Sequence, residues 1–180
     1  MTCLMGIYNK TDTSTFSSGS YLSTLPLVNV QNRVLGNVAR STDATITSTK
    51  FDMNLGSEIP IGIFGIVNHN LSTAATYRLR FGNDATFAVS LYDTGVIDVW
   101  DTAYTYETLN FENSNFWSLL PTADDISGFT ATVVHILTST QVCQYVRCEI
   151  FDTTNATGHV DMGRIFCGPT WVPQKDMVIG

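Results

Sequence analysis

The segment from Gln144 to Gly168 constrains the fold of this chain more than any other. Polar or amphipathic side chains alternate with apolar ones from Tyr145 to Ile150, which is the pattern of a strand with one buried face. A turn-forming stretch covers residues 152–158. A second apolar-rich run extends from His159 to Gly168, and Gly163 within it marks a bulge or a tight contact. The segment therefore predicts two strands joined as a closing hairpin, which is typical of a β-sandwich.

Similar patterns recur along the chain and predict about eight strands. The expected strands cover residues 45–55, 61–67, 75–81, 87–93, 94–101, 130–137, 144–150 and 159–168. The most apolar of them, Ile61–Val67, is expected at the centre of a sheet. Because no stretch has the pattern of an amphipathic helix, the sequence predicts an all-β, antiparallel sandwich.

The length of 180 residues fits one domain with ordered extensions. We expect an N-terminal arm in residues 1–20, a β-sandwich in residues 21–168 and a C-terminal extension in residues 169–180. The first residues lack the basic and apolar regions of a signal peptide, so none is expected. No apolar run approaches the roughly 20 residues that span a bilayer, so no membrane span is expected.

The charge pattern excludes one class of partner. Charged residues make up only 14% of the chain, the net charge is −7, and the nine lysines and arginines are scattered. Binding to a nucleic-acid backbone depends on clustered cations, so no nucleic-acid partner is expected. Nucleophile-elbow, zinc-protease, P-loop and dinucleotide motifs are also missing from the sequence. We therefore expect no catalytic residue, cofactor or metal.

The cysteines are expected to be free thiols buried in a protein made in a reducing cytoplasm. They are Cys3, Cys143, Cys148 and Cys167. A disulfide stays open as the second choice, because Cys148 and Cys167 could face each other across the closing hairpin. Cys143 and Cys148 lie five residues apart, which places them on opposite faces of a regular strand. With no CxxC pair, a zinc site is not expected.

Residues 101–128, which we call the aromatic loop, hold more aromatic side chains than an irregular polar stretch needs. Together with the C-terminal extension they supply the candidates for a protein interface, because aromatic rings bury a large area at a small entropy cost. These candidates are Tyr104, Tyr106, Phe111, Phe116, Trp117 and Trp171. The alternative is that half of these rings cap the open ends of the core.

Two arginines are candidates for structural ion pairs. Arg40 and Arg164 each stand between apolar neighbours, where a guanidinium is usually held in a fork by a carboxylate or by carbonyl groups. Arg164 is expected to pair with Asp152, Asp161 or another acid near the turn. Asp152 and Asp161 could instead bind calcium together with Asn155. An Asx turn is favoured, because the oxygen ligands are few.

A second group of acids, Asp93, Asp98 and Asp101, lies beside Trp100. Carboxylates can accept hydrogen bonds from sugar hydroxyls while an indole stacks on the sugar ring, so this group could hold a saccharide. Paired carboxylates also serve glycosidases, but nothing fixes the spacing here and catalysis is not favoured. His69 could hydrogen-bond a sugar or a partner backbone. A turn in which the Asn-His-Asn sequence satisfies free backbone groups is favoured.

The closing segment resembles the galactose-binding-like, or discoidin-like, jelly-roll domains. These domains often end with an aromatic-hydrophobic-Arg-x-acidic-x strand and a hydrophobic-Gly step. Residues Tyr145–Ile150 and Ile165–Gly168 match the two parts of that pattern. The resemblance implies a jelly-roll sandwich.

A longer resemblance covers nearly the whole chain, which is similar to a family of tail-tip or baseplate proteins of tailed bacteriophages. The matching segments are residues 25–32, 39–42, 66–72, 91–95, 152–155, 158–160 and 162–169. The resemblance implies a non-enzymatic structural protein of the virion tail, assembled in the host cytoplasm. It would dock in several copies against other tail proteins such as hub, tube or fibre proteins.

Two alternatives to that main functional prediction stay open. The first is a carbohydrate-binding module that recognises host-surface glycans, which would have a concave, solvent-facing aromatic site beside acids and amides. The second is a glycan-processing enzyme.

Overall fold

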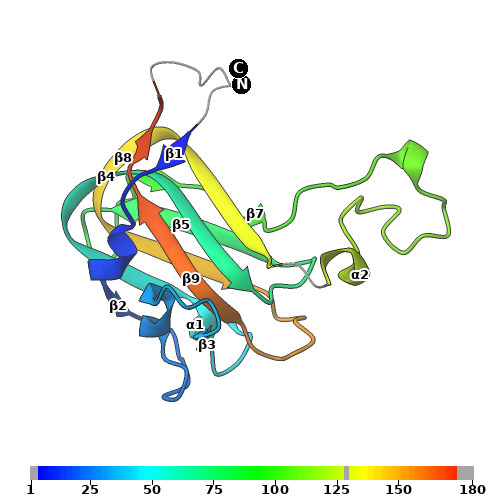
Figure 1. Cartoon of the computed structure of the whole chain (residues 1–180), viewed down its shortest axis with the longest axis horizontal. Coiled ribbons are helices and arrows are strands. Elements are labelled where there is room, and N and C mark those ends of the chain that lie inside the picture. The colour runs from blue at the N-terminus through cyan, green and yellow to red at the C-terminus, as the bar shows by residue number, and fades with distance from the viewer. Residues whose placement is uncertain (1–3, 128–129, 174–180) are drawn as a thin grey trace.

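The computed structural model of the chain describes residues 4–127 and 130–173 and consists mainly of antiparallel strands (Figure 1). The strands are β1 (Met5–Gly6), β2 (Thr15–Ser17), β3 (Ala39–Arg40), β4 (Phe51–His69), β5 (Thr76–Gly82), β6 (Tyr92–Asp93), β7 (Ile97–Asp98), β8 (Thr132–Phe151), β9 (Asp161–Gly168) and β10 (Thr170–Trp171). The short helices are η1 (Lys10–Thr13), η2 (Leu27–Gln31), α1 (Ile46–Thr49), η3 (Tyr106–Thr108) and α2 (Ala123–Ile126). None of the helices in the described part is long and apolar enough to cross a membrane.

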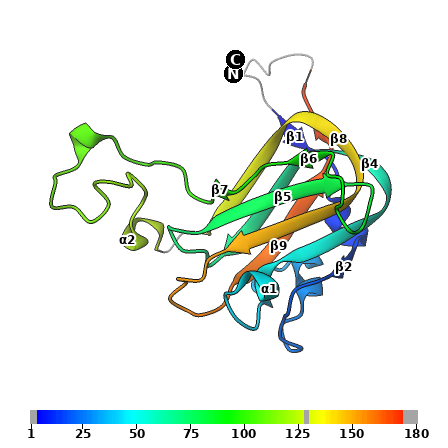
Figure 2. The same cartoon turned by 180° about the vertical axis from the view of Figure 1, so that it is seen from behind.

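The two long strands, β4 and β8, pass from one layer of a sandwich to the other. In the first layer, residues 51–54 of β4 pair with β2 on one side and with residues 145–148 of β8 on the other. The last residues of β8, from Tyr145 to Phe151, also pair with β5. In the second layer, residues 59–69 of β4 pair with β9 and with the first half of β8, and β9 also pairs with β3. The β4–β8 ladder shifts register between the two halves. Figures 1 and 2 show both strands curving round one end of the molecule.

The core lies between the two layers. Phe51, Phe64 and Phe81 are its largest fully buried side chains. On β8, Val146, Cys148 and Ile150 face the core with no exposed area, as the alternation in that segment predicts. The expectation of an antiparallel sandwich is confirmed.

The predicted closing hairpin is wrong. The end of β8 pairs with β4 and β5 in the first layer, whereas β9 pairs with β4 and β3 in the second. Residues 152–160 therefore connect the two layers rather than two neighbouring strands. Alternation shows that one face of a strand is buried, but it does not identify the strand beside it.

Other boundaries also differ from the sequence-based expectation. Residues 46–49 form α1, whereas 45–55 had been expected in strands, and of residues 87–93 only Tyr92 and Asp93 are in a strand. The expected strands 130–137 and 144–150 are the two halves of β8. The tight contact expected at Gly163 is confirmed, because a Cβ there would lie 2.9 Å from the carbonyl oxygen of Leu35.

The described cysteines are all buried. Cys143 and Cys148 both face the core, against the expectation of opposite faces, because the alternation of β8 shifts where the strand passes between layers. Cys148 and Cys167 lie in different layers, and both are free thiols, as is Cys143. Burial raises the pKa of the Cys143 thiol to about 12. Cys3 lies outside the described residues.

Ile7 and Asn9 cover the edge of β9. The Asn9 side chain accepts a hydrogen bond from the backbone N–H of Cys167 (3.0 Å) and donates one to the carbonyl of Ile165 (2.9 Å). The backbone N–H of Ile7 donates to the carbonyl of Pro169 at 3.2 Å. A side-chain amide thus replaces the neighbouring strand that the edge of β9 lacks at this point.

We expect Asn9→Ala to lower the free energy of unfolding by about 2 kcal/mol, because a buried N–H and a buried C=O of β9 lose their partner. Urea unfolding measures the change. Asn113→Ala is the matched control, since the Asn113 amide makes a local bond in an exposed turn. Equal stability of the Asn9 variant and the wild type would contradict the capping role.

Candidate functional site

A cleft of about 810 Å³ opens at the end of the sandwich where β7, the start of β8 and the aromatic loop meet. Aromatic, acidic and hydroxyl side chains line it together. The lining includes Tyr77, Asp98, Trp100, Asp101, Thr132 and His135. We call this site the Trp100 cleft.

Trp100 is held in one orientation. Its indole N–H donates to the carbonyl of Ser72 at 2.9 Å, and its ring meets the imidazole of His69 edge-on at 5.7 Å between centroids. The backbone N–H of Val99 donates to the carbonyl of Ala75, which ties this segment to the start of β5. The half-buried indole is therefore a fixed aromatic surface in the wall of the cleft.

His135, in the wall of the cleft, contacts two tyrosines. Its Nδ1 lies 3.4 Å from the hydroxyl of Tyr77, and its Nε2 lies 3.0 Å from the hydroxyl of Tyr92. A neutral imidazole donates through one nitrogen and accepts through the other, so it can satisfy both contacts. Burial lowers the pKa of His135, and burial also raises the pKa of Tyr77 to about 12. Both shifts favour the uncharged forms of His135 and Tyr77 at neutral pH.

Asp98 and Asp101 supply the negative charge of the cleft. Both side chains are exposed, and neither forms an ion pair with another part of the described chain. Their oxygens are therefore available to accept hydrogen bonds from a ligand. The third acid of the predicted group, Asp93, lies elsewhere and forms a fork with Arg78. That guanidinium lowers the pKa of Asp93 to about 2.

The structure places the ion-pair candidates with other partners than the sequence suggested. Arg164 donates to both oxygens of Asp12, at 2.8 and 2.9 Å, and to the carbonyl of Gln31. Arg164 is held by a carboxylate and a carbonyl, as expected, but the carboxylate belongs to Asp12, 152 residues away in the sequence. Asp161 instead forms a fork with Arg40, directly opposite it in the β3–β9 ladder.

The proposed calcium ligands are also engaged within the protein. Asp152 accepts hydrogen bonds from the backbone and hydroxyl of Ser72 and from the amide of Asn155. Asn155 in turn accepts from the backbone N–H of Thr157, which is the favoured Asx turn. In the residues that the structure describes, no three His, Cys, Asp or Glu side chains are grouped to hold a metal.

His69 fits the favoured turn. Its Nδ1 accepts from the backbone N–H of Leu71 at 3.2 Å, and the residue is 9% exposed. Burial lowers the pKa of His69 to about 4, so the ring is neutral. It supports Trp100 from behind rather than reaching a ligand itself.

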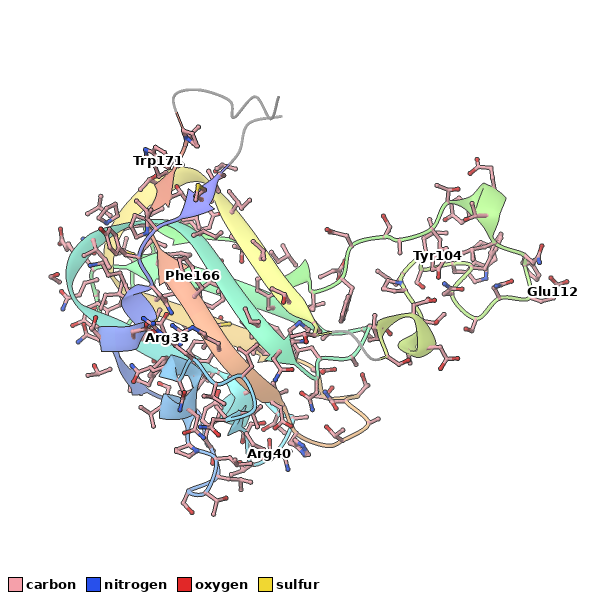
Figure 3. All side chains as sticks on the ribbon, in the orientation of Figure 1. Arg33, Arg40, Tyr104, Glu112, Phe166 and Trp171 are labelled. Atoms are coloured by element: carbon pink, nitrogen blue, oxygen red, sulfur yellow. The ribbon has the colours of Figure 1, made fainter. Side chains whose placement is uncertain are left out.

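The interface candidates divide into two groups. Five of them lie on the aromatic loop, which extends away from the sandwich, and Figure 3 shows Tyr104 and Glu112 on this extension. The hydroxyl of Tyr104 donates to Asp125 of α2 at 2.8 Å, which joins the beginning of the loop to its end. Trp171 lies on β10, beside β1. The role of these rings at a protein interface stays a prediction.

Sequence reasoning found Trp100, Asp98 and Asp101 but missed Tyr77 and His135. Both missed residues occupy inward-facing positions of strands, where an aromatic side chain is usually interpreted as part of the hydrophobic core. One signal was present, because His135 interrupts an apolar strand at an inward-facing position.

The solved structures that are similar to the chain include three sugar-binding domains. It aligns with the lectin domain of lectinolysin in complex with the Lewis b antigen at 11% identity and a TM-score of 0.56, covering 96% of this chain and 100% of that one. It aligns with the family 32 carbohydrate-binding module of Clostridium perfringens NanJ in complex with galactose at 10% identity and a TM-score of 0.56, covering 94% and 100%. A Streptococcus pneumoniae fucose-binding module aligns at 9% identity and a TM-score of 0.55, covering 89% and 94%.

No protein-family model and no curated protein matches the chain. The prediction of a tail-tip or baseplate protein is wrong on these findings, because the structural neighbours are carbohydrate-binding domains and none points to a phage tail. The predicted tail-protein partners lose their support with it, and the predicted location in a virion stays an untested prediction. The shorter resemblance is confirmed at the level of the fold: the chain has the jelly-roll sandwich of galactose-binding-like domains.

Proposed function

We propose that the protein is a non-catalytic carbohydrate-binding module and that the Trp100 cleft holds the saccharide. The observation that carries the proposal is the combination of a fixed indole with free carboxylates in one open cleft. This is the kind of site that separates a lectin from an assembly protein: a concave aromatic surface beside hydrogen-bonding groups.

The groups that line the cleft would contact different parts of a sugar. The indole of Trp100 packs against the C–H face of a sugar ring, which needs a flat apolar surface. Asp98 and Asp101 accept hydrogen bonds from sugar hydroxyls, and such bonds to a charged acceptor are stronger than neutral ones. The hydroxyl of Thr132 adds a group that both donates and accepts.

The fold comparison supports the same function. Structures of similar fold include complexes with the Lewis b antigen and with galactose, and a fucose-binding module, so a neutral saccharide with galactose or fucose units is the first ligand to test. Fold alone does not determine function, and the proposal therefore depends on the cleft.

The test is binding of the whole chain to a panel of saccharides that contains galactose, fucose and Lewis b, followed by calorimetry. We expect Trp100→Ala to weaken binding by at least about tenfold, because an aromatic contact contributes on the order of 1 kcal/mol or more beyond buried area. Asp98→Asn combined with Asp101→Asn is expected to weaken binding further.

Trp171→Ala is the matched control, because it removes a half-exposed indole on β10, outside the lining of the cleft. Circular dichroism and the melting temperature verify that each variant is folded. Wild-type protein that binds none of the saccharides, or a folded Trp100→Ala variant that binds as tightly as the wild type, would refute the proposal.

A further inference from the structure

The aromatic loop presents a cluster of rings to solvent. Phe116 packs against Tyr106, Phe111 and Trp117 with centroid distances of 5.5, 5.5 and 5.2 Å. Tyr106, Phe111 and Trp117 are nevertheless 54%, 68% and 74% exposed. Figures 1 and 2 show that the loop leaves the sandwich and extends beyond it, so the fold of one copy leaves this apolar surface uncovered.

The negative charge of the aromatic loop indicates which kind of surface could bind it. Residues 101–128 contain five acids and no lysine, arginine or histidine. Two such loops would repel each other, which disfavours a contact between loops in a dimer. A surface that accepts the loop needs apolar side chains together with uncompensated positive charge.

The same chain carries such a surface. A groove of about 520 Å³ lies beside η1 and includes Ile7, Tyr8, Lys10, Arg33 and Phe166 in its lining. Ile7 and Tyr8 are 48% and 68% exposed. We call it the Lys10 groove.

The cations of the Lys10 groove are available for a partner. Arg33 is the only described arginine outside the ion pairs of the described chain, and Lys10 takes part in none of them. The five other arginines are engaged with aspartate or glutamate. The chain therefore combines one acidic aromatic projection with one groove that holds free cations and exposed apolar side chains.

The loop faces away from the groove of its own chain. Figure 3 shows Arg33 and Phe166 on the side of the molecule opposite to Tyr104 and Glu112, and Figure 2 shows the loop on the far side from β2 as well. A second copy is therefore the partner that the geometry allows.

We propose that the protein forms a two-fold dimer in which the aromatic loop of each copy binds in the Lys10 groove of the other. Phe111 and Trp117 pack on Ile7, Tyr8 and Phe166, while Glu107 and Glu112 approach Lys10 and Arg33. The exchange is reciprocal, so two identical contacts close the dimer and no open edge is left to polymerise. This proposal does not depend on saccharide binding.

The mass of the full chain in solution tests the dimer, measured by light scattering during gel filtration over a range of concentrations. We expect twice the 19.8 kDa of one chain for the wild type. Phe111→Ser with Trp117→Ser is expected to give the mass of one chain, as is Lys10→Glu with Arg33→Glu. High salt should weaken the dimer, because it screens the charge attraction.

Mixing the two variants distinguishes loop-to-groove exchange from any other dimer. The loop variant keeps an intact groove and the groove variant keeps an intact loop, so an equimolar mixture regains one contact and forms a heterodimer. Val89→Ser is the matched control, because it removes an apolar side chain that is 75% exposed outside both surfaces. A wild type that is monomeric at every concentration, a dimer that survives both variants, or a mixture that stays monomeric would overturn the proposal.

Discussion

Phe64→Ala is expected to lower the free energy of unfolding by about 4 kcal/mol, the range measured when a large aromatic side chain is removed from a packed core. Phe64 has no exposed area and lies on β4 in the second layer, directly opposite Cys167 of β9 on one side and His135 of β8 on the other. Removing its ring opens a cavity between three strands. Two of these strands, β4 and β8, continue into the first layer, and β9 is paired with β4 on one side and with β3 on the other. The backbone around the cavity therefore cannot move in to fill it.

Urea or thermal unfolding measures this loss. Val89→Ala is the control, because it shortens an apolar side chain that is 75% exposed outside both proposed contact surfaces, and it is expected to change stability by less than about 0.5 kcal/mol. A loss below about 1 kcal/mol for Phe64→Ala would show that the two layers are not packed on each other as described.

The sequence predicts the strand content of this fold better than its pairing. Residues 61–67, 75–81 and 145–150 were all expected in strands, because local alternation reports which face of a strand is buried. Nothing local reports that β4 and β8 each cross between layers, since a strand of the first layer and a strand of the second have the same pattern. The closing hairpin was therefore predicted wrongly even though both of its strands exist.

The same limit applies to the candidate site. Trp100, Asp98 and Asp101 are close in sequence, so their proximity in space could be predicted. Tyr77 and His135 join them only because β5, in the first layer, and the first half of β8, in the second, face each other across the core. Arg164 pairs with Asp12 for a similar reason, since η1 packs on β9 from the other end of the chain.

The fork between Asp52 and Arg147 gives the second large prediction. Asp52 accepts two bonds from Arg147 and one from the hydroxyl of Ser18, and the guanidinium lies 4.5 Å from the ring centroid of Phe87. The side chains of Asp52 and Arg147 are only 11% and 18% exposed. Asp52→Asn leaves a largely buried guanidinium without its counter-charge, so we expect a loss of about 3 kcal/mol at pH 7.

The pH dependence identifies the cause of that loss. Burial by itself raises the pKa of Asp52, but the hydrogen bonds from Arg147 and Ser18 outweigh it, and the pKa lies below its usual value. The native state therefore binds fewer protons than the unfolded chain, whose aspartates titrate near about 3.9. The stabilisation is complete above that pH and is lost as the pH falls below it.

Urea unfolding of Asp52→Asn and of the wild type should accordingly differ most above pH 5 or so, and the difference should shrink as the pH falls below about 3.9. Asp98→Asn is the control, because it removes an exposed carboxylate without an ion pair. Arg147→Met added to Asp52→Asn is expected to recover part of the lost stability, since a pair replaced by neutral side chains leaves no uncompensated charge behind. A deficit that is the same at acid and neutral pH, or a double variant that is less stable than the single one, would mean that packing rather than charge holds β4 to β8 here.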